Sequence, residues 1–471
     1  MTLSIKSIGG VGNEIPTVTN LKVIKYSQTT IDIEYKVEDV ELTICRHYLY
    51  LNGSKKEITK AVGYESSNNI FKYQITGLTR NTPYTIQIGA SDGHDEGLSK
   101  AIQQNTQNIA LIGVRVMENN SNPNSSVTYI EQAVGTNPAN SRSLGGWENK
   151  WPFNKIRIVG FKNGRVTKEI KKDNKKQYVD GSTVPTDVDV MVEIPKIYWD
   201  FKDISNGYEL RISDEKFNST CACLAHKVSG VEKNNIYVGA YLGSFDSSRH
   251  LRSVSEASPK VSTTITNFRN RAHDNGDGYQ QFNFYTLTLI QILYLIAFKN
   301  LDSQSALGKG YTARSNTSTK ITGGTNTKGF VYGESYGDEQ MCFLGIEDLW
   351  GNVFQFVDGI FYSNMHSFLV NQDNKSFNDN RDGYVGVASG YGLAGYINKV
   401  SHNNDSGFIP EKTEGSINTY YCDYASENDE SFGVFGGNWK DTVASGVWSI
   451  RFFGTSTDST TTKGGRLCYL G

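Results

Sequence analysis

Apolar and polar residues alternate in short runs through the first part of the chain, and turns separate these runs. In residues 30–35, the side chains of Ile31, Ile33 and Tyr35 fall on one face of an extended segment, because successive side chains of a strand point to opposite sides. Residues 16–107 repeat this pattern at a spacing of about eight to twelve residues, which is typical of a β-sandwich. We therefore predict a small sandwich over residues 16–107.

The last part of the predicted sandwich carries a turn and a strand that are typical of one family. The segment GLTRNTPY at residues 77–84 leads into a strand in which Tyr84, Ile86 and Ile88 alternate with polar residues. The Tyr84 hydroxyl is placed to close the corner between two sheets. This stretch resembles a fibronectin type III domain, although Tyr35 stands where that family usually has Trp. The resemblance implies a spacer or an adhesion module with no catalytic role.

A polar stretch at residues 103–108 ends this first region, and the pattern beyond it is less regular. We place a domain boundary near residue 107 and treat residues 108–471 as one large domain, because no long Gly/Ser-rich or Pro-rich linker interrupts them. Apolar residues at helical spacing predict helices over residues 261–273 and 285–299. The remainder predicts short strands and long loops, so the expected fold class is mainly β with an α+β C-terminal part.

The longest apolar stretch, LTLIQILYLIAF at residues 287–298, is shorter than the roughly 20 residues that a membrane-spanning helix needs. It predicts a buried helix, and we expect no membrane insertion. Residues 1–15 have neither the basic start nor the apolar run of a signal peptide, so export by that route is not expected. Six cysteines are too few for a disulfide scaffold and are expected to be buried thiols.

Charge and composition narrow the classes of function. Lys and Arg number 47 against 49 Asp and Glu, which gives a net charge of −2 with neutral His. A nucleic-acid-binding surface normally shows a basic excess, so we expect no nucleic-acid partner. The 27 Tyr residues and an aromatic content of 12% favour recognition by stacking and hydrogen bonding.

Three short motifs occur in order along the large domain. They are LWGNVFQF at residues 349–356, GGNW at 436–439 and GGRL at 464–467. Together they resemble the C-type-lectin-like fold in its formylglycine-generating-enzyme branch. Four further segments are similar to phage tail and receptor-binding proteins built on that fold, including hypervariable ones diversified by retroelements. These segments are residues 189–198, 237–241, 407–410 and 419–423.

The resembled fold is shared by enzymes and binding proteins, so individual side chains must decide between the two classes. Formylglycine-generating enzymes hold copper with a cysteine pair in the C-terminal segment, and residues 436–465 of this chain contain no cysteine. Related iron-dependent synthases need clustered histidines, whereas the histidines here are scattered. We expect a non-enzymatic protein without catalytic residues and keep a formylglycine-generating-type metal oxidase as a remote alternative.

The segment GVWSIRFF at residues 446–453 predicts a strand with two different faces. Alternation places Trp448, Ile450 and Phe452 together on one face, as a buried set, and leaves the other face displayed. The displayed face carries an Arg and a Phe, which are residue types that anchor interfaces. In the lectin-like tail proteins, the ligand-contacting positions lie on this strand and in the loop after the Gly-Gly-x-Trp motif. The resemblance therefore implies six ligand-binding residues: Lys440, Asp441, Ser449, Arg451, Phe453 and Thr455.

Each of these roles has a structural alternative. Phe453 can cap the core or a subunit contact, and Arg451 can form a surface ion pair worth about 0–1 kcal/mol. The polar residues after Thr455 can form a loop with no role. Arg466, which follows two glycines, is interpreted as a structural residue that donates hydrogen bonds to loop carbonyls.

Two groups of residues are candidates for a metal. Cys221 and Cys223, with His226 nearby, lack the spacing and the second ligand pair of a zinc knuckle. An acidic loop offers hard oxygen donors for calcium but lacks the spacing of an EF-hand, so we expect a solvated loop and no cofactor, with calcium as the open alternative. The carboxylates of this loop are Asp373, Asp379 and Asp382.

We interpret the chain as the receptor-binding protein of a phage tail or a tail-like particle. Residues 1–15 are expected to attach it to other tail or baseplate proteins, and residues 108–471 to bind a bacterial surface glycan or protein. Because single-site affinity for a cell surface is modest, several copies are expected to act together, as a homo-oligomer such as a trimer. The protein is expected in the virion tail, made in the host cytoplasm and released by lysis. The alternative is a structural tail, baseplate or capsid-decoration protein that binds no receptor.

Overall fold

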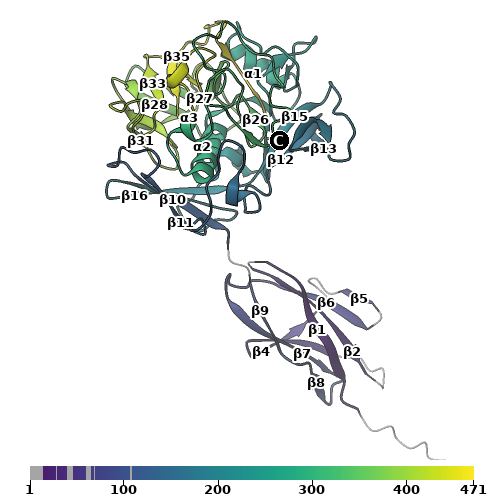
Figure 1. The fold of residues 1–471 in the computed structure, drawn as a ribbon. Coiled ribbons are helices and arrows are strands. Elements are labelled where there is room, and N and C mark those ends of the chain that lie inside the picture. Colours follow the sequence, from purple (N-terminus) through teal and green to yellow (C-terminus); the bar gives the residue numbers. More distant parts are fainter. Residues whose placement is uncertain (1–13, 28, 40–45, 60–64, 68, 107–108) are drawn as a thin grey trace, which may run out of the picture. The chain divides into compact units, whose positions relative to one another are not determined.

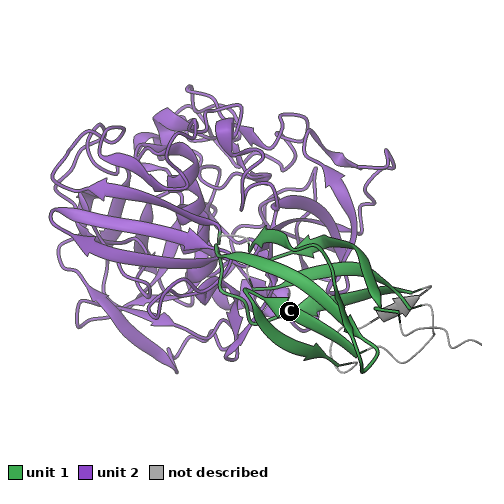
Figure 2. Cartoon of the chain, turned by 90° about the horizontal axis from the view of Figure 1, so that it is seen from below, with its two compact units in different colours: residues 1–109 green, residues 110–471 purple. Residues whose placement is uncertain are grey.

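The computed structural model describes residues 14–27, 29–39, 46–59, 65–67, 69–106 and 109–471 (Figure 1). The chain divides into two compact units, residues 1–109 (unit 1) and residues 110–471 (unit 2) (Figure 2). Most of the predicted attachment segment, residues 1–13, lies outside the described residues.

Unit 1, in its described part, is a β-sandwich of two sheets. One sheet has the order β1 (Thr17–Tyr26), β2 (Ile31–Glu38), β6 (Ile70–Ile75) and β5 (Glu65–Ser67). The other has the order β4 (Ser54–Ile58), β3 (Arg46–Leu51), β7 (Pro83–Ser91) and β8 (Glu96–Leu98), and β9 (Ile102–Asn105) also pairs with β7.

The predicted inward face of unit 1 is confirmed. Ile31, Ile33 and Tyr35 on β2 are buried in one apolar cluster with residues of the other sheet. The Tyr84 hydroxyl accepts a hydrogen bond of 2.8 Å from the Thr79 backbone N–H. This bond confirms that Tyr84 closes the turn that leads into β7.

Unit 2 is mainly β, and its described residues form three larger sheets. The first has the order β11 (Val127–Glu131), β10 (Leu111–Met117), β17 (Gly207–Ser213) and β16 (Tyr198–Ile204). The second has the order β14 (Asn174–Tyr178), β13 (Arg165–Lys171), β12 (Arg157–Lys162), β15 (Asp189–Pro195), β20 (Asn235–Gly239), β37 (Leu467–Tyr469) and β23 (Tyr279–Gln281). The third has the order β29 (Tyr384–Ser389), β28 (Ser367–Asn371), β27 (Phe354–Tyr362), β34 (Ser431–Phe435), β35 (Ile450–Gly454), β33 (Tyr424–Glu427) and β30 (Ala394–Tyr396), and β36 (Lys463–Gly464) pairs in parallel with β27.

Short strands form smaller, separate sheets in unit 2. A three-stranded sheet contains β24 (Val331–Tyr332), β25 (Cys342–Phe343) and β26 (Ile346–Glu347). The two-stranded pairs are β18 (Lys227–Val228) with β19 (Val231–Glu232), β21 (Ser244–Phe245) with β22 (Leu251–Arg252), and β31 (Lys399–Ser401) with β32 (Ile409–Lys412).

The described part of unit 2 contains three α-helices, α1 (Ile265–His273), α2 (Phe284–Phe298) and α3 (Ser303–Ala306). All residues of α2 are buried, as the apolar run predicts. α1 begins at residue 265 rather than at residue 261, because the Thr264 side chain caps it by accepting a hydrogen bond from the Asn267 N–H. Among the described residues, no helix is long and apolar enough to cross a membrane.

One buried guanidinium connects the C-terminal segment to the rest of unit 2. The Arg466 side chain donates hydrogen bonds to the Gln355 side-chain oxygen at 2.7 Å and to the backbone oxygens of Gly239 at 2.8 Å, Glu347 at 2.8 Å and Asp348 at 2.9 Å. Arg466 is fully buried, and this burial lowers its pKa to about 10, so it remains charged at neutral pH. The interpretation of Arg466 as a structural residue that binds carbonyl oxygens is confirmed.

Replacing Arg466 with Met should destabilise the chain strongly, because it leaves these buried oxygens without a donor. We expect the free energy of unfolding to fall by about 3–5 kcal/mol, measured by urea or thermal unfolding of the full chain. Arg165→Met, at an exposed position of β13, is the matched control and should change stability by less than about 0.5 kcal/mol. A loss in Arg466→Met as small as that of the control would contradict the structural role.

Candidate ligand-binding face

The strand predicted to carry the ligand contacts forms in the middle of the third sheet. β35 pairs antiparallel with β34 and parallel with β33. Trp448, Ile450 and Phe452 are buried, so the predicted core set of this segment is confirmed.

The expectation that Ser449 is displayed is wrong. Its exposed fraction is 0%, and its hydroxyl donates a hydrogen bond of 3.1 Å to the backbone oxygen of Tyr424. The Ser449 carbonyl accepts a further bond of 2.9 Å from the Gly436 N–H. Ser449 lies just before β35 and is hydrogen-bonded to the backbone of Tyr424 and of Gly436. Alternation along β35 therefore does not predict its exposure.

Arg451 lies in a stack of aromatic rings. Its guanidinium carbon is 5.0 Å from the ring centroid of Phe354 and 5.0 Å from that of Tyr424. One terminal nitrogen lies 3.6 Å from the Asp441 carboxylate, and the side chain keeps 15% of its exposure. Among the described residues, no hydrogen-bond acceptor meets its buried Nε. The ion pair considered as an alternative for Arg451 is therefore present, and it holds the guanidinium at the edge of the surface.

Phe453 extends the same stack. Its ring meets that of Phe354 edge to face, with centroids 5.4 Å apart, and the Lys463 ammonium lies 4.1 Å from the centroid of the Phe453 ring. Lys463 is itself buried and forms an ion pair with Asp458. Phe453 is half-buried, so it both covers the core, as its structural alternative states, and reaches the surface.

The remaining predicted residues lie in the loops beside β35. Lys440 is exposed, and its ammonium is 4.8 Å from the Trp439 ring centroid. Asp441 is half-buried and accepts hydrogen bonds from the backbone and the side chain of Asn438 at 3.1 and 3.2 Å. Thr455 is exposed and pairs with the hydroxyl of Thr457 at 3.1 Å.

Two tyrosines of this face were missed in the sequence. Tyr396 on β30 is paired in register with Tyr424 on β33, and their rings meet edge to face with centroids 5.6 Å apart. Both are half-buried. Tyr424 stands in the tyrosine-rich segment TYYCDY, which is the one sequence signal for it, whereas Tyr396 has none. The tyrosines complete a line of contacting side chains, here called the aromatic–cationic row: Tyr396, Tyr424, Arg451, Phe354, Phe453 and Lys463.

Two of the three carboxylates suggested for calcium accept hydrogen bonds within the protein. The Asp379 carboxylate accepts hydrogen bonds from Arg269 at 2.8 Å and from the Thr266 hydroxyl, and the Asp373 carboxylate accepts one from the Ser229 N–H at 2.6 Å. Among the described residues, no three His, Cys, Asp or Glu side chains form a group that could hold a metal ion.

The Cys221–Cys223 segment also departs from expectation in one respect. Cys221 is partly exposed, whereas the cysteines were expected to be buried. Cys223 is buried, which raises the pKa of its thiol to about 12, and burial lowers the pKa of neighbouring His226 to about 3. Both groups therefore stay neutral at ordinary pH.

No family model matches the chain, and no curated protein matches it. Among solved structures, the Major Tropism Determinant U1 variant is similar at 12% identity and a TM-score of 0.26, over 88% of this chain and 85% of that one. The I1 variant of the same determinant is similar at 11% identity and a TM-score of 0.26, over 87% of this chain and 83% of that one. Chitinase ChiA74 from Bacillus thuringiensis is similar at 16% identity and a TM-score of 0.17, over 45% of this chain and only 25% of the chitinase. Similarity this remote assigns no function to the chain.

The same change to leucine, made separately at Ser449 and at Thr455, tests the different surroundings of these two residues. Ser449→Leu places a large side chain in a filled site and should lower the free energy of unfolding by about 1–3 kcal/mol. Thr455→Leu, at an exposed position, should change it by less than about 0.5 kcal/mol. Thermal unfolding of the two variants measures both effects, and equal stability of the pair would show that Ser449 is displayed after all.

Proposed function

We propose that this chain is a non-enzymatic receptor-binding protein of a phage tail or tail-like particle, and that unit 2 attaches the particle to a bacterial surface glycan or protein. The observation that carries the proposal is the aromatic–cationic row, in which Tyr396, Tyr424, Phe453 and Arg451 are half-buried and reach the surface, with Lys440 and Thr455 exposed in the adjoining loops. The ligand contacts are assigned to the half-buried members of the row, Tyr396, Tyr424, Arg451 and Phe453, and to these two loop residues, together with Asp441. Phe354 and Lys463 are buried and support the row from within. Ser449 is excluded because it is buried.

The physical properties of the row suit binding. Tyrosine and arginine bury much area and form several hydrogen bonds, so they are common energetic centres of interfaces. Here the guanidinium is already held between two rings and beside Asp441. Ordering these side chains when a ligand binds therefore costs little conformational entropy.

The same contacts favour binding over turnover. Within the described residues of the row, the charged groups are engaged in ion pairs, Arg451 with Asp441 and Lys463 with Asp458. Catalysis by a nucleophile needs an adjacent base to activate it. In the row, the cations Arg451 and Lys463 are instead held by carboxylates and aromatic rings.

The rest of the proposed arrangement follows from this role. Unit 1 serves as a fibronectin-like spacer, and residues 1–15 attach to other tail or baseplate proteins. Several copies, in a homo-oligomer such as a trimer, bind one cell at the same time, because linked weak sites gain affinity through effective concentration. The protein is made in the host cytoplasm and reaches the virion tail before lysis.

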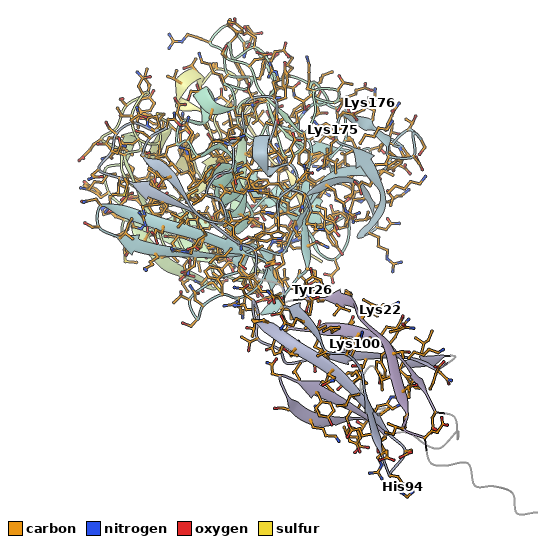
Figure 3. The ribbon with its side chains drawn as sticks, turned by 60° about the horizontal axis from the view of Figure 1, so that its bottom comes forward. Lys22, Tyr26, His94, Lys100, Lys175 and Lys176 are labelled. Atoms are coloured by element: carbon orange, nitrogen blue, oxygen red, sulfur yellow. The ribbon has the colours of Figure 1, made fainter. Side chains whose placement is uncertain are left out.

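Attachment of the labelled full chain to a panel of bacterial strains tests the proposal. The double variant Lys440→Glu/Tyr424→Ala should lower attachment at least about ten-fold, equal to about 1.4 kcal/mol, because it reverses an exposed charge and removes one ring of the Arg451 stack. The matched control is Lys100→Glu/Tyr26→Ala, at two exposed positions of unit 1 labelled in Figure 3, and it should leave attachment unchanged.

Thermal unfolding shows whether the double variant remains folded, and Lys440→Glu alone, at an exposed position, separates binding from stability. Equal attachment by the double variant and the control would contradict the assigned face. Absence of attachment to every strain would favour the structural tail or decoration protein instead.

A further inference from the structure

A polar cleft lies in unit 2 apart from the aromatic–cationic row. Its volume is about 510 Å³, within the range of small-molecule sites. The two residues after β10, the β16–β17 turn, and the β31–β32 pair with its flanking residues supply its walls. Its charged lining residues are Glu118, Asp203, Glu414, Lys399, Lys412 and His402.

His402 bridges two carboxylates in the wall of this cleft. Its Nδ1 lies 2.9 Å from the Asp203 carboxylate, and its Nε2 lies 3.4 Å from that of Glu118. The ring stacks on Tyr208 with centroids 4.7 Å apart. An imidazole donates through both nitrogens only when it carries both protons. Burial opposes this charge, but the hydrogen bond to Glu118 and the charges of Glu118 and Asp203 outweigh burial and raise the pKa of His402.

Glu118 keeps an unused acceptor in the same wall. Its side chain is only 10% exposed, and one carboxylate oxygen faces His402. The other oxygen is buried, and no hydrogen-bond donor among the described residues meets it. A buried polar atom without a partner costs free energy, so the Glu118 carboxylate is held in this wall at a cost to stability.

The charges of the cleft balance. Three carboxylates, those of Glu118, Asp203 and Glu414, face three cationic groups, those of Lys399, Lys412 and protonated His402. Uncharged amides complete the polar lining, from Asn119, Asn206 and Asn398. The cleft therefore offers donors and acceptors in similar number and no excess charge to attract an ion.

We propose that this cleft is a saccharide-binding site, in which sugar hydroxyls bond to the carboxylates, amides and lysines of its lining. Each hydroxyl both donates and accepts, which matches this mixed lining. A small ammonium ligand would need acceptors alone, and the balanced charges of the cleft give it no net attraction. The site uses none of the residues of the aromatic–cationic row, so it does not rest on the proposed function.

Saturation-transfer NMR of the full chain with methyl glycosides tests this site. The probes are neutral, N-acetylated and amino methyl glycosides at up to about 10 mM, where a site of millimolar affinity is mostly occupied. Glu118→Gln should weaken binding of the best glycoside at least about ten-fold, because it removes the charged acceptor. Glu169→Gln is the matched control, because Glu169 is an exposed glutamate of β13 that does not line the cleft, and it should leave affinity unchanged.

Asn119→Trp keeps the test decisive if Glu118→Gln is unstable. Asn119 is an exposed lining residue, so a large ring there should fill the cleft and abolish binding while the His402 bridge remains. The proposal is overturned if no glycoside shows transfer, if Glu118→Gln and Asn119→Trp both bind as wild type, or if methylammonium binds and the neutral glycosides do not.

Discussion

The architecture of unit 2 depends on the buried guanidinium of Arg466. Its partners belong to three different sheets: Gln355 lies on β27, Gly239 ends β20, and Glu347 ends β26. Burying a charge is costly, and the cost is offset only where good hydrogen bonds replace water. Together these bonds join the C-terminal segment to three sheets, so the sheets hold one arrangement rather than packing as independent layers.

The polar network that begins at Arg466 extends into the loops. The Glu347 carboxylate accepts hydrogen bonds of 2.7 Å from the N–H groups of Gly323 and Thr325, and the Thr325 carbonyl accepts one of 3.0 Å from buried Lys175 on β14. Such buried hydrogen-bond networks make a loop-rich fold rigid. Rigidity matters for both proposed sites, since preorganised side chains lose little entropy on binding. The two sites also adjoin along the chain, because Asn398 of the cleft follows Tyr396 of the row by two residues.

Local patterns were sufficient for the elements whose burial follows from their own sequence. The alternation of Ile31, Ile33 and Tyr35 predicted their burial, and the apolar run at residues 287–298 predicted a buried helix. The start of α1 was predicted less well, because apolar spacing continues past the residue that caps the helix. The helix starts after Thr264 because the Thr264 side chain accepts one hydrogen bond from the first turn. The spacing of apolar residues does not reveal this bond.

The sequence by itself determined the mainly β composition, the core face of Trp448, Ile450 and Phe452, and the structural role of Arg466. Only the tertiary structure decided what the opposite face displays. Ser449 is hidden because the backbone of Tyr424 covers it, and Tyr396 joins the row because β30 pairs with β33. Alternation states on which side of a strand a residue lies, whereas exposure depends on the neighbouring strands, and those come from distant parts of the chain.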